Sequence, residues 1–398
     1  LNFTNKGFYL NGKRIKLRGL NRHQSFPYVG YAMPKSAQYK DADLLKYELG
    51  VNFVRLSHYP QSRHFLDRCD QIGLLVMEEI PGWRYVGDKF WQEVMSRNTS
   101  DMILNHINHP SIIMWGVRIT ESDDHNILYE RINALAKKID DTRPTTGARN
   151  IGNSDLFDDI YSYNDYSYKG ENRALNKKKK ISKTDKPYLV SEYGGYMLPT
   201  KKFDNESRRR QQALRHLEVL EVMESDDEIL GAAGWSMFDY NTARQFGSGD
   251  NIAYYGVMDM YRIPKYAAYV YSSQQNMYPI MNIASSMNPG DYDGSLLDDI
   301  YVFTNCDYIK LYKNKQFIGS YYPDKRRYPS LEHPPIIIED LIGDSLEKEE
   351  GFSKGDARRL KDLLISYSKS NTGFTTMDNI KMGRLLLKYK LDMIDAEK

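Results

Sequence analysis

The stretch that decides the fold runs from residue 112 to residue 122 and reads Ile112-Ile113-Met114-Trp115-Gly116-Val117-Arg118-Ile119-Thr120-Glu121-Ser122. It begins as an apolar run, typical of a strand that is buried on both faces of a parallel sheet, and it ends in a polar loop. A second stretch, Tyr188-Leu189-Val190-Ser191-Glu192-Tyr193-Gly194-Gly195, has the same character. Each therefore places a glutamate, Glu121 or Glu192, where a buried strand gives way to a loop.

Outward from these stretches, short apolar runs alternate with amphipathic helical patterns, which is typical of a parallel α/β fold. In one helical pattern, Leu128, Ile132, Leu135 and Ile139 recur at steps of four, three and four, and so lie on one helix face. Eight strands with intervening helices match the roughly 250 residues of a (β/α)8 TIM barrel, which we predict for residues 1–275. The predicted strands are residues 15–20, 51–56, 74–78, 112–117, 145–149, 160–163, 188–192 and 232–238.

A second, smaller module is expected over residues 276–398. The turn-rich connector 288–294 follows Tyr278-Pro279, and it precedes short antiparallel strands that we predict at 300–303, 309–312 and 316–318. From residue 341 to residue 391 the pattern turns helical and strongly charged. We interpret this module as a partial immunoglobulin-like β-sandwich with a helical insertion. It has too few strands to close, so we expect it to be incomplete.

Composition excludes several classes of protein. The 398 residues are 41% hydrophobic and 13% aromatic, enough for a sizeable core. A formal net charge of +2 gives no reason to expect a nucleic-acid or anionic-membrane partner. There is no run of about 18 apolar residues and no N-terminal signal segment. The two cysteines, Cys69 and Cys306, are too few for a disulfide framework. We therefore expect a cytoplasmic protein.

The two strand-end glutamates carry the candidate chemistry. In a (β/α)8 barrel the carboxyl ends of the strands meet at the face that holds the active site. If the carboxyl groups of Glu121 and Glu192 lie roughly 5 Å apart, one can attack an anomeric carbon while the other protonates the leaving oxygen. A single strand-end glutamate is more often a salt bridge or a helix cap. Two of them within these motifs indicate hydrolysis of a glycosidic bond.

Ordered motifs across the barrel resemble glycoside hydrolase family 2, and within it the bacterial β-galactosidases. They are Gly19-Leu20-Asn21-Arg22-His23, Val54-Arg55-Leu56-Ser57-His58-Tyr59-Pro60, Trp115 to Glu121, Ser191-Glu192-Tyr193-Gly194-Gly195, and Gly234-Trp235-Ser236-Met237-Phe238-Asp239-Tyr240, continuing to Gly256-Val257-Met258-Asp259. The resemblance implies the catalytic barrel of the family, here without its N-terminal sugar-binding and immunoglobulin-like domains.

The resemblance also implies retaining double displacement, with Glu192 as the nucleophile and Glu121 as the general acid/base. Arg55 would hold Glu192 ionised, and Tyr166 would donate a hydrogen bond to it. In the family an asparagine directly precedes the acid/base and reaches the sugar 2-hydroxyl. Here Thr120 takes that place, and its hydroxyl can donate one hydrogen bond over a shorter reach.

Further residues are implied to surround the sugar. His23 and His58 would line the subsite, although satisfied core histidines are the alternative for both. Trp235 would be the indole platform under the apolar face of the sugar. Asp239 belongs to the same motif and could be structural.

No metal and no cofactor are expected. Residues 75–79 lack the following Glu-x-His arrangement that supplies metal ligands in the best-known β-galactosidases, and no HExxH motif occurs. A sugar isomerase or a metal-dependent barrel hydrolase would need such ligand clusters.

The expected substrate is a β-galactoside. β-Glucuronidases of the family carry an Asn-x-Lys pair before the glycine that corresponds to Gly256, but this chain has Ala253-Tyr254-Tyr255 there, without a cation. A neutral sugar is therefore favoured, while β-mannosidase activity stays open.

A catalytically silent, carbohydrate-binding barrel is the alternative of a different class. It is motivated by Thr120 and by the domains that the resemblance does not cover.

Overall fold

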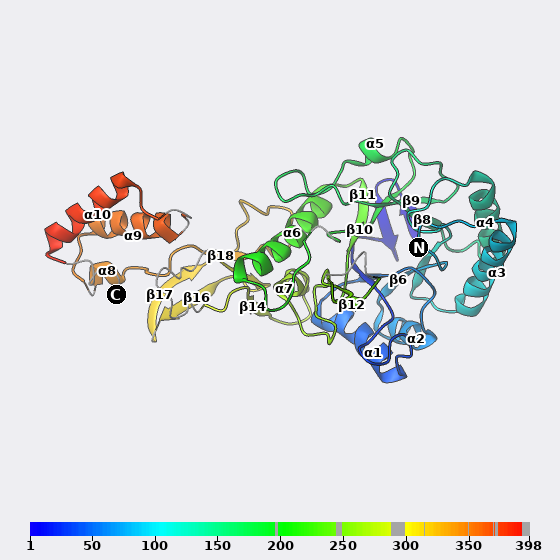
Figure 1. The fold of residues 1–398 in the computed structure, drawn as a ribbon, viewed down its shortest axis with the longest axis horizontal. Coiled ribbons are helices and arrows are strands. Elements are labelled where there is room, and N and C mark those ends of the chain that lie inside the picture. The colour runs from blue at the N-terminus through cyan, green and yellow to red at the C-terminus, as the bar shows by residue number, and fades with distance from the viewer. Residues whose placement is uncertain are drawn as a thin grey trace. The chain divides into compact units, whose positions relative to one another are not determined.

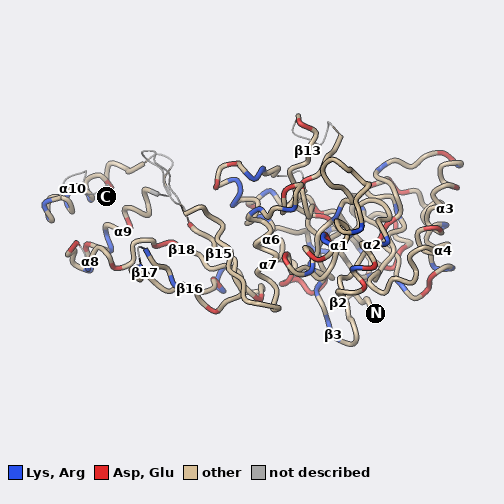
Figure 2. The backbone as a smooth tube through the Cα atoms, turned by 90° about the horizontal axis from the view of Figure 1, so that it is seen from below, with Lys and Arg blue, Asp and Glu red and all other residues tan. Residues whose placement is uncertain are grey.

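A computed structural model describes residues 1–195, 198–243, 249–287, 299–313, 315–348, 350–368, 370 and 373–391 (Figure 1). The chain forms two compact units, which are described separately. One unit comprises Leu1–Met277 with Tyr328–Glu332, and the other comprises Tyr278–Arg327 with His333–Lys398. The predicted connector at 288–294 lies outside the described residues. Figure 2 shows basic and acidic residues mixed along the backbone of both units, as the small net charge suggests.

The first unit is built around a closed barrel, which confirms the predicted TIM-barrel fold. Eight strands follow one another around the barrel in the order β10-β11-β4-β5-β6-β7-β8-β9, and the neighbours are parallel. Because all eight run the same way, their carboxyl ends meet at one face. The strands are β4 (Leu17–Arg22), β5 (Phe53–Leu56), β6 (Leu75–Glu79), β7 (Ile112–Gly116), β8 (Thr145–Arg149), β9 (Ile160–Asn164), β10 (Tyr188–Tyr193) and β11 (Ile229–Gly234).

Helices surround the strands (Figure 1). The predicted apolar stripe on α4 is present, since Leu128 and Ile132 are buried. The connection from β8 to β9, residues 150–159, contains no helix. The helices of this unit are α1 (Lys35–Asp43), which continues as the π-helical turn η1 (Leu44–Glu48), α2 (Arg63–Ile72), α3 (Lys89–His106), α4 (Asn126–Ile139), α5 (Lys178–Ile181), α6 (Glu206–Ser225) and α7 (Tyr266–Ser272). No described helix is both long enough and apolar enough to cross a membrane.

A three-stranded antiparallel sheet closes the amino end of the barrel. Its strands are β1 (Asn2–Thr4), β2 (Gly7–Leu10) and β3 (Lys13–Ile15). Phe8 is fully buried in one cluster with Leu17 and Phe53, which are the first residues of β4 and β5. The apolar core therefore fills the amino end of the barrel, and the carboxyl end is left for a site.

The last barrel strand differs from its predicted bounds of 232–238, because β11 starts three residues earlier and ends at Gly234. A Cβ atom on Gly231 would lie 2.2 Å from the carbonyl oxygen of Leu17 on the neighbouring strand. The two strands therefore need a glycine at this point. Glycine weakens the strand signal in a sequence, which explains why the bounds were wrong. Trp235 and Asp239 consequently lie in the loop after the strand.

The described residues of the second unit form small antiparallel sheets and three helices. β14 (Met281–Ile283), β15 (Ile300–Thr304) and β18 (Ile336–Ile338) form one sheet, and β16 (Ile309–Lys313) pairs with β17 (Gln316–Tyr321). A separate apolar cluster joins α9 to α10. The immunoglobulin-like interpretation of residues 276–398 stays a prediction. The helices are α8 (Ser345–Lys348), α9 (Lys354–Ser368) and α10 (Thr376–Tyr389).

Candidate active site

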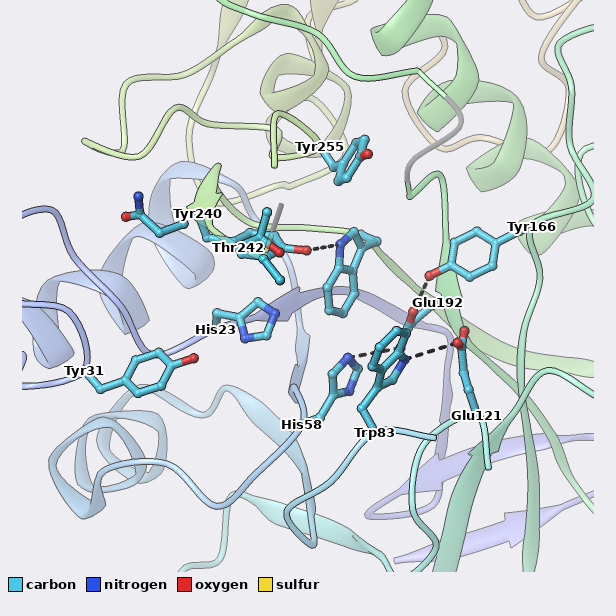
Figure 3. Close-up of a pocket in the computed structure, with 13 residues that line it drawn as sticks. His23, Tyr31, His58, Trp83, Glu121, Tyr166, Glu192, Tyr240, Thr242 and Tyr255 are labelled. Carbon is cyan, nitrogen blue, oxygen red and sulfur yellow. Dashed lines mark hydrogen bonds and ion pairs between the residues drawn. The ribbon is translucent and has the colours of Figure 1, made fainter. Parts of the chain in front are cut away.

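A pocket of about 550 Å³ opens at the carboxyl ends of the barrel strands (Figure 3). Glu192 of β10 and Glu121, which follows β7, both line it. One side includes β12 (Tyr240–Asn241), a short strand that pairs antiparallel with β13 (Ile252–Ala253). The described lining residues are His23, Tyr31, His58, Trp83, Glu121, Tyr166, Glu192, Trp235, Tyr240, Asn241, Thr242, Ala243 and Tyr255.

Glu192 is held by donors on both carboxylate oxygens. Arg55 donates from Nη1 to Oε1 at 2.5 Å, and the Tyr166 hydroxyl donates to Oε2. His58 Nε2 lies 3.9 Å from Oε1. Charge-assisted hydrogen bonds of this kind are stronger than neutral ones and stabilise an anion. Both oxygens of this side chain, which is only 3% exposed, therefore accept hydrogen bonds from fixed donors.

Arg55 lies at the centre of a buried charge network. Its Nε and Nη2 atoms bind the two oxygens of Glu79 at 3.0 and 2.9 Å, and Nη1 also donates to Asn21. Burial lowers the pKa of Arg55, but Glu79 and Glu192 outweigh burial and raise it above its ordinary value. The pKa of Glu79 is lowered, because Arg55 and His58 outweigh its own burial. The guanidinium is thus a permanent cation between two carboxylates.

Glu121 has a different set of partners. Its Oε2 atom accepts from Trp83 Nε1 at 3.2 Å and from Arg84 Nε at 3.0 Å, and its Oε1 atom accepts from Asn164 Nδ2 at 3.1 Å. The Arg84 side chain is 48% exposed, whereas Arg55 is not exposed at all. The backbone of Glu121 is left-handed, with φ of 57°, which is uncommon for a residue other than glycine. Both glutamates are therefore buried, but the cations beside them differ. Arg55 beside Glu192 is fully buried, whereas Arg84 beside Glu121 is partly exposed.

Aromatic rings form another wall of the pocket. The His58 and Trp235 rings stack with centroids 5.1 Å apart and planes 10° apart, and His23 meets Trp235 edge-on at 5.3 Å. Trp235 Nε1 donates to the Tyr240 hydroxyl at 2.9 Å, which fixes the indole. Burial, together with the neighbouring His58 and Arg55, lowers the pKa of His23 well below its ordinary value, so the ring is neutral at neutral pH. A flat aromatic wall suits the apolar face of a sugar.

Residues 1–275 match the family model for the TIM barrel domain of glycosyl hydrolases family 2. The chain belongs to glycoside hydrolase family 2. The match covers the whole barrel and confirms the resemblance that the motifs indicate.

Proteins that are similar to this chain include two β-galactosidases. One, from Thermoanaerobacterium thermosulfurigenes, is 51% identical over 346 residues, which are 85% of this chain and 48% of that protein. Another, from Thermoanaerobacter pseudethanolicus, is 48% identical over 334 residues, which are 83% of this chain and 44% of that protein. The chain thus spans about half the length of the curated relatives it matches. A solved structure, the β-glucuronidase of Parabacteroides merdae with glycerol in its active site, is 26% identical with a TM-score of 0.70, covering 84% of this chain and 46% of that chain.

Most of the residues that the family 2 motifs predict for the site lie in one pocket. His23, His58, Glu121, Tyr166, Glu192 and Trp235 all line it. Three others are buried and are not among its described lining residues: Arg55, Thr120 and Asp239.

Thr120 and Asp239 have identifiable partners behind the pocket. The Thr120 hydroxyl accepts from Arg55 Nη2 at 2.9 Å and is 3.4 Å from Glu79 Oε1. Asp239 accepts from Lys265 Nζ at 2.6 Å and from the Gly256 amide at 2.9 Å, and burial raises its pKa to about 7. Both residues therefore support the loops that carry pocket residues.

The motifs missed three donors to Glu121, namely Trp83, Arg84 and Asn164. Asn164 ends β9, and a search of strand-end positions could have found it. Trp83 and Arg84 lie further along the loop after β6, where only the path of the backbone brings them to Glu121.

No three His, Cys, Asp or Glu side chains among the described residues are grouped in a way that could hold a metal ion. The expectation that the site uses neither metal nor cofactor stays a prediction.

Proposed function

We propose that this chain carries the catalytic barrel of a retaining β-galactosidase. The observation that carries the proposal is the pair of glutamates in one pocket with contrasting partners. Arg55 and Tyr166 hold Glu192 as an anion, which a nucleophile requires. The cation at Glu121 is the surface residue Arg84, whose charge solvent screens more than that of the buried Arg55.

The reaction follows from these roles. Glu192 attacks the anomeric carbon while Glu121 gives its proton to the leaving oxygen, so the sugar becomes esterified to Glu192. Glu121, now a carboxylate, takes a proton from a water molecule, which attacks the same carbon and frees Glu192. Two inversions give net retention. The predicted carboxyl separation near 5 Å belongs to this proposal.

The choice of a galactoside has two supports. Relatives at 51% and 48% identity carry the name β-galactosidase. Tyr255 lines the pocket, and neither Lys nor Arg is among the described lining residues, so no described lining cation is available for the carboxylate of an acidic sugar. A neutral sugar therefore fits better than a glucuronide.

A panel of nitrophenyl β-glycosides tests the proposal. We expect the purified chain to hydrolyse the galactoside in preference to the mannoside and the glucuronide. Release of β-galactose before mutarotation, followed by NMR, would show retention. If the galactoside bound without turning over, and Glu192→Gln behaved like the unaltered chain, the barrel would be a carbohydrate-binding protein instead.

A cytoplasmic location is part of the proposal. Cys69 and Cys306 are both free thiols, which suits a reducing compartment.

A further inference from the structure

Trp83 flanks the proposed acid/base on the inside of the pocket. Its Nε1 atom donates to Glu121 Oε2 at 3.2 Å, and its ring lines the cavity with 38% of the residue exposed (Figure 3). Figure 3 shows the interaction that joins the indole to Glu121 as a dashed line. An indole of which more than a third remains exposed can accept a further flat or apolar group.

The loop after β6 fixes this indole in place. The Arg84 guanidinium carbon lies 4.3 Å from the centroid of the Trp83 ring, and the same guanidinium binds Glu121. On the backbone, the Gly82 amide donates to His58 O at 3.0 Å and the Arg84 amide donates to Thr120 O at 2.8 Å. The loop is thus tied to the ends of β5 and β7, and a ring held in this way loses little entropy when a ligand stacks on it.

The position of the ring determines which part of a substrate it meets. This step rests on the proposed function. The leaving oxygen must lie against Glu121 to receive its proton, so the group attached to that oxygen lies next to whatever flanks Glu121. His58, which stacks on Trp235, lies with Nε2 3.9 Å from Glu192 Oε1 and so belongs to the wall beside the proposed nucleophile. The scissile bond would therefore run between two aromatic surfaces, with Trp83 on the side of the leaving group.

We propose that Trp83, with Arg84 behind it, forms a binding subsite for the leaving group and that this subsite takes a second sugar ring. A pyranose has an apolar face of C–H groups that stacks on indole, and its hydroxyls can accept from a guanidinium. The loop continues with Tyr85, which is 69% exposed and meets Trp91 edge-on at 5.9 Å. The preferred substrates are then β-galactosyl di- and oligosaccharides rather than simple alkyl galactosides.

The experiment compares a variant that keeps an aromatic ring at position 83 with a variant that has none. Trp83→Phe and Trp83→Leu both remove the indole N–H that reaches Glu121, but only the phenylalanine retains a flat ring. For a galactosyl-glucose disaccharide, we expect Trp83→Leu to raise KM about tenfold and Trp83→Phe to raise it about threefold at most. For methyl β-galactoside, which has no ring in its leaving group, the two variants should have KM values within about twofold of each other.

A control and a binding measurement complete the test. Tyr28→Leu removes a ring that is 95% exposed on another loop, and it should leave KM unchanged for both substrates. Equal KM values for the leucine and phenylalanine variants with the disaccharide would contradict the proposal that the Trp83 ring forms this subsite. Binding of the disaccharide to Glu192→Gln, measured by calorimetry with and without Trp83→Leu, tests the subsite without turnover. Binding that depends on Trp83 while the unaltered chain hydrolyses no galactoside would support the subsite and reject only the proposed function.

Discussion

Arg55 donates to Glu192 at 2.5 Å from a position that is completely excluded from solvent. The same guanidinium binds both oxygens of Glu79, which is 1% exposed. Two buried carboxyl groups thus share one buried cation, so the proposed nucleophile is positioned by a group that does not line the pocket.

Arg55→Met should therefore reduce both stability and activity. The loss of one partner from a buried ion pair costs about 3–5 kcal/mol, because an uncompensated charge stays buried. Urea unfolding measures that loss. The double variant Arg55→Met/Glu79→Gln removes one of the stranded carboxylates and should regain part of the stability without regaining turnover. If kcat returned together with stability, Arg55 would serve the fold alone.

Glu192→Gln should abolish turnover of every substrate, since an amide cannot form the glycosyl ester. Steady-state hydrolysis of nitrophenyl and methyl galactosides measures this loss. Circular dichroism of the variant is the control for folding. Residual turnover above about one part in a thousand, with any substrate, would indicate another nucleophile.

Glu121→Ala should affect the methyl galactoside most, because a poor leaving group needs the proton. Nitrophenyl galactoside needs little acid assistance, so the galactosyl-enzyme should still form and then accumulate. Added azide should attack it and restore turnover, with β-galactosyl azide as the product. Equal losses on both substrates and no response to azide would contradict the assignment of Glu121.

The sequence located Glu121 and Glu192 because each follows or ends a strand, and the topology of a parallel barrel brings such positions together. His23 and Trp235 were located through the resemblance to family 2. It could not locate Trp83 or Arg84 as partners of Glu121. Their contacts depend on how the loop after β6 is tied to His58 O and Thr120 O, and periodicity carries no information about loop paths. The bounds of β11 were wrong for a related reason, since the close approach at Gly231 is a tertiary contact.

Acid should destabilise the barrel through His216. Burial lowers the pKa of this histidine to about 3, and its Nδ1 atom lies 2.9 Å from the Tyr271 hydroxyl. In the unfolded chain the ring takes up a proton near pH 6.5, whereas the folded chain excludes it. The stabilising contribution is therefore present above pH 6.5 and is lost as the pH falls towards 3, with a slope of up to about 1.4 kcal/mol per pH unit. His216→Gln should flatten the dependence of the urea unfolding free energy between pH 6.5 and 5. An unchanged slope would show that other groups dominate it.

Thr120 joins the charge network to the acid/base. Its hydroxyl accepts from Arg55, and the next residue is Glu121. The asparagine that the family usually has here could keep that acceptor through its carbonyl oxygen and use its amide to reach the sugar 2-hydroxyl. This contact strengthens as positive charge develops at the anomeric carbon, and such contacts together with substrate distortion contribute several kcal/mol.

Thr120→Asn should therefore raise kcat/KM for nitrophenyl galactoside, by about tenfold if it gains about 1.4 kcal/mol in the transition state. It should do little for the 2-deoxy substrate, which has no hydroxyl to bind. Thr120→Val is the control, because it removes the hydroxyl that contacts Arg55 and Glu79 without adding an amide, and it should lower kcat/KM for both substrates by the same factor. A loss of activity with the galactoside in Thr120→Asn, or equal gains on both sugars, would show that the pocket is adapted to threonine and that this residue acts only through Arg55.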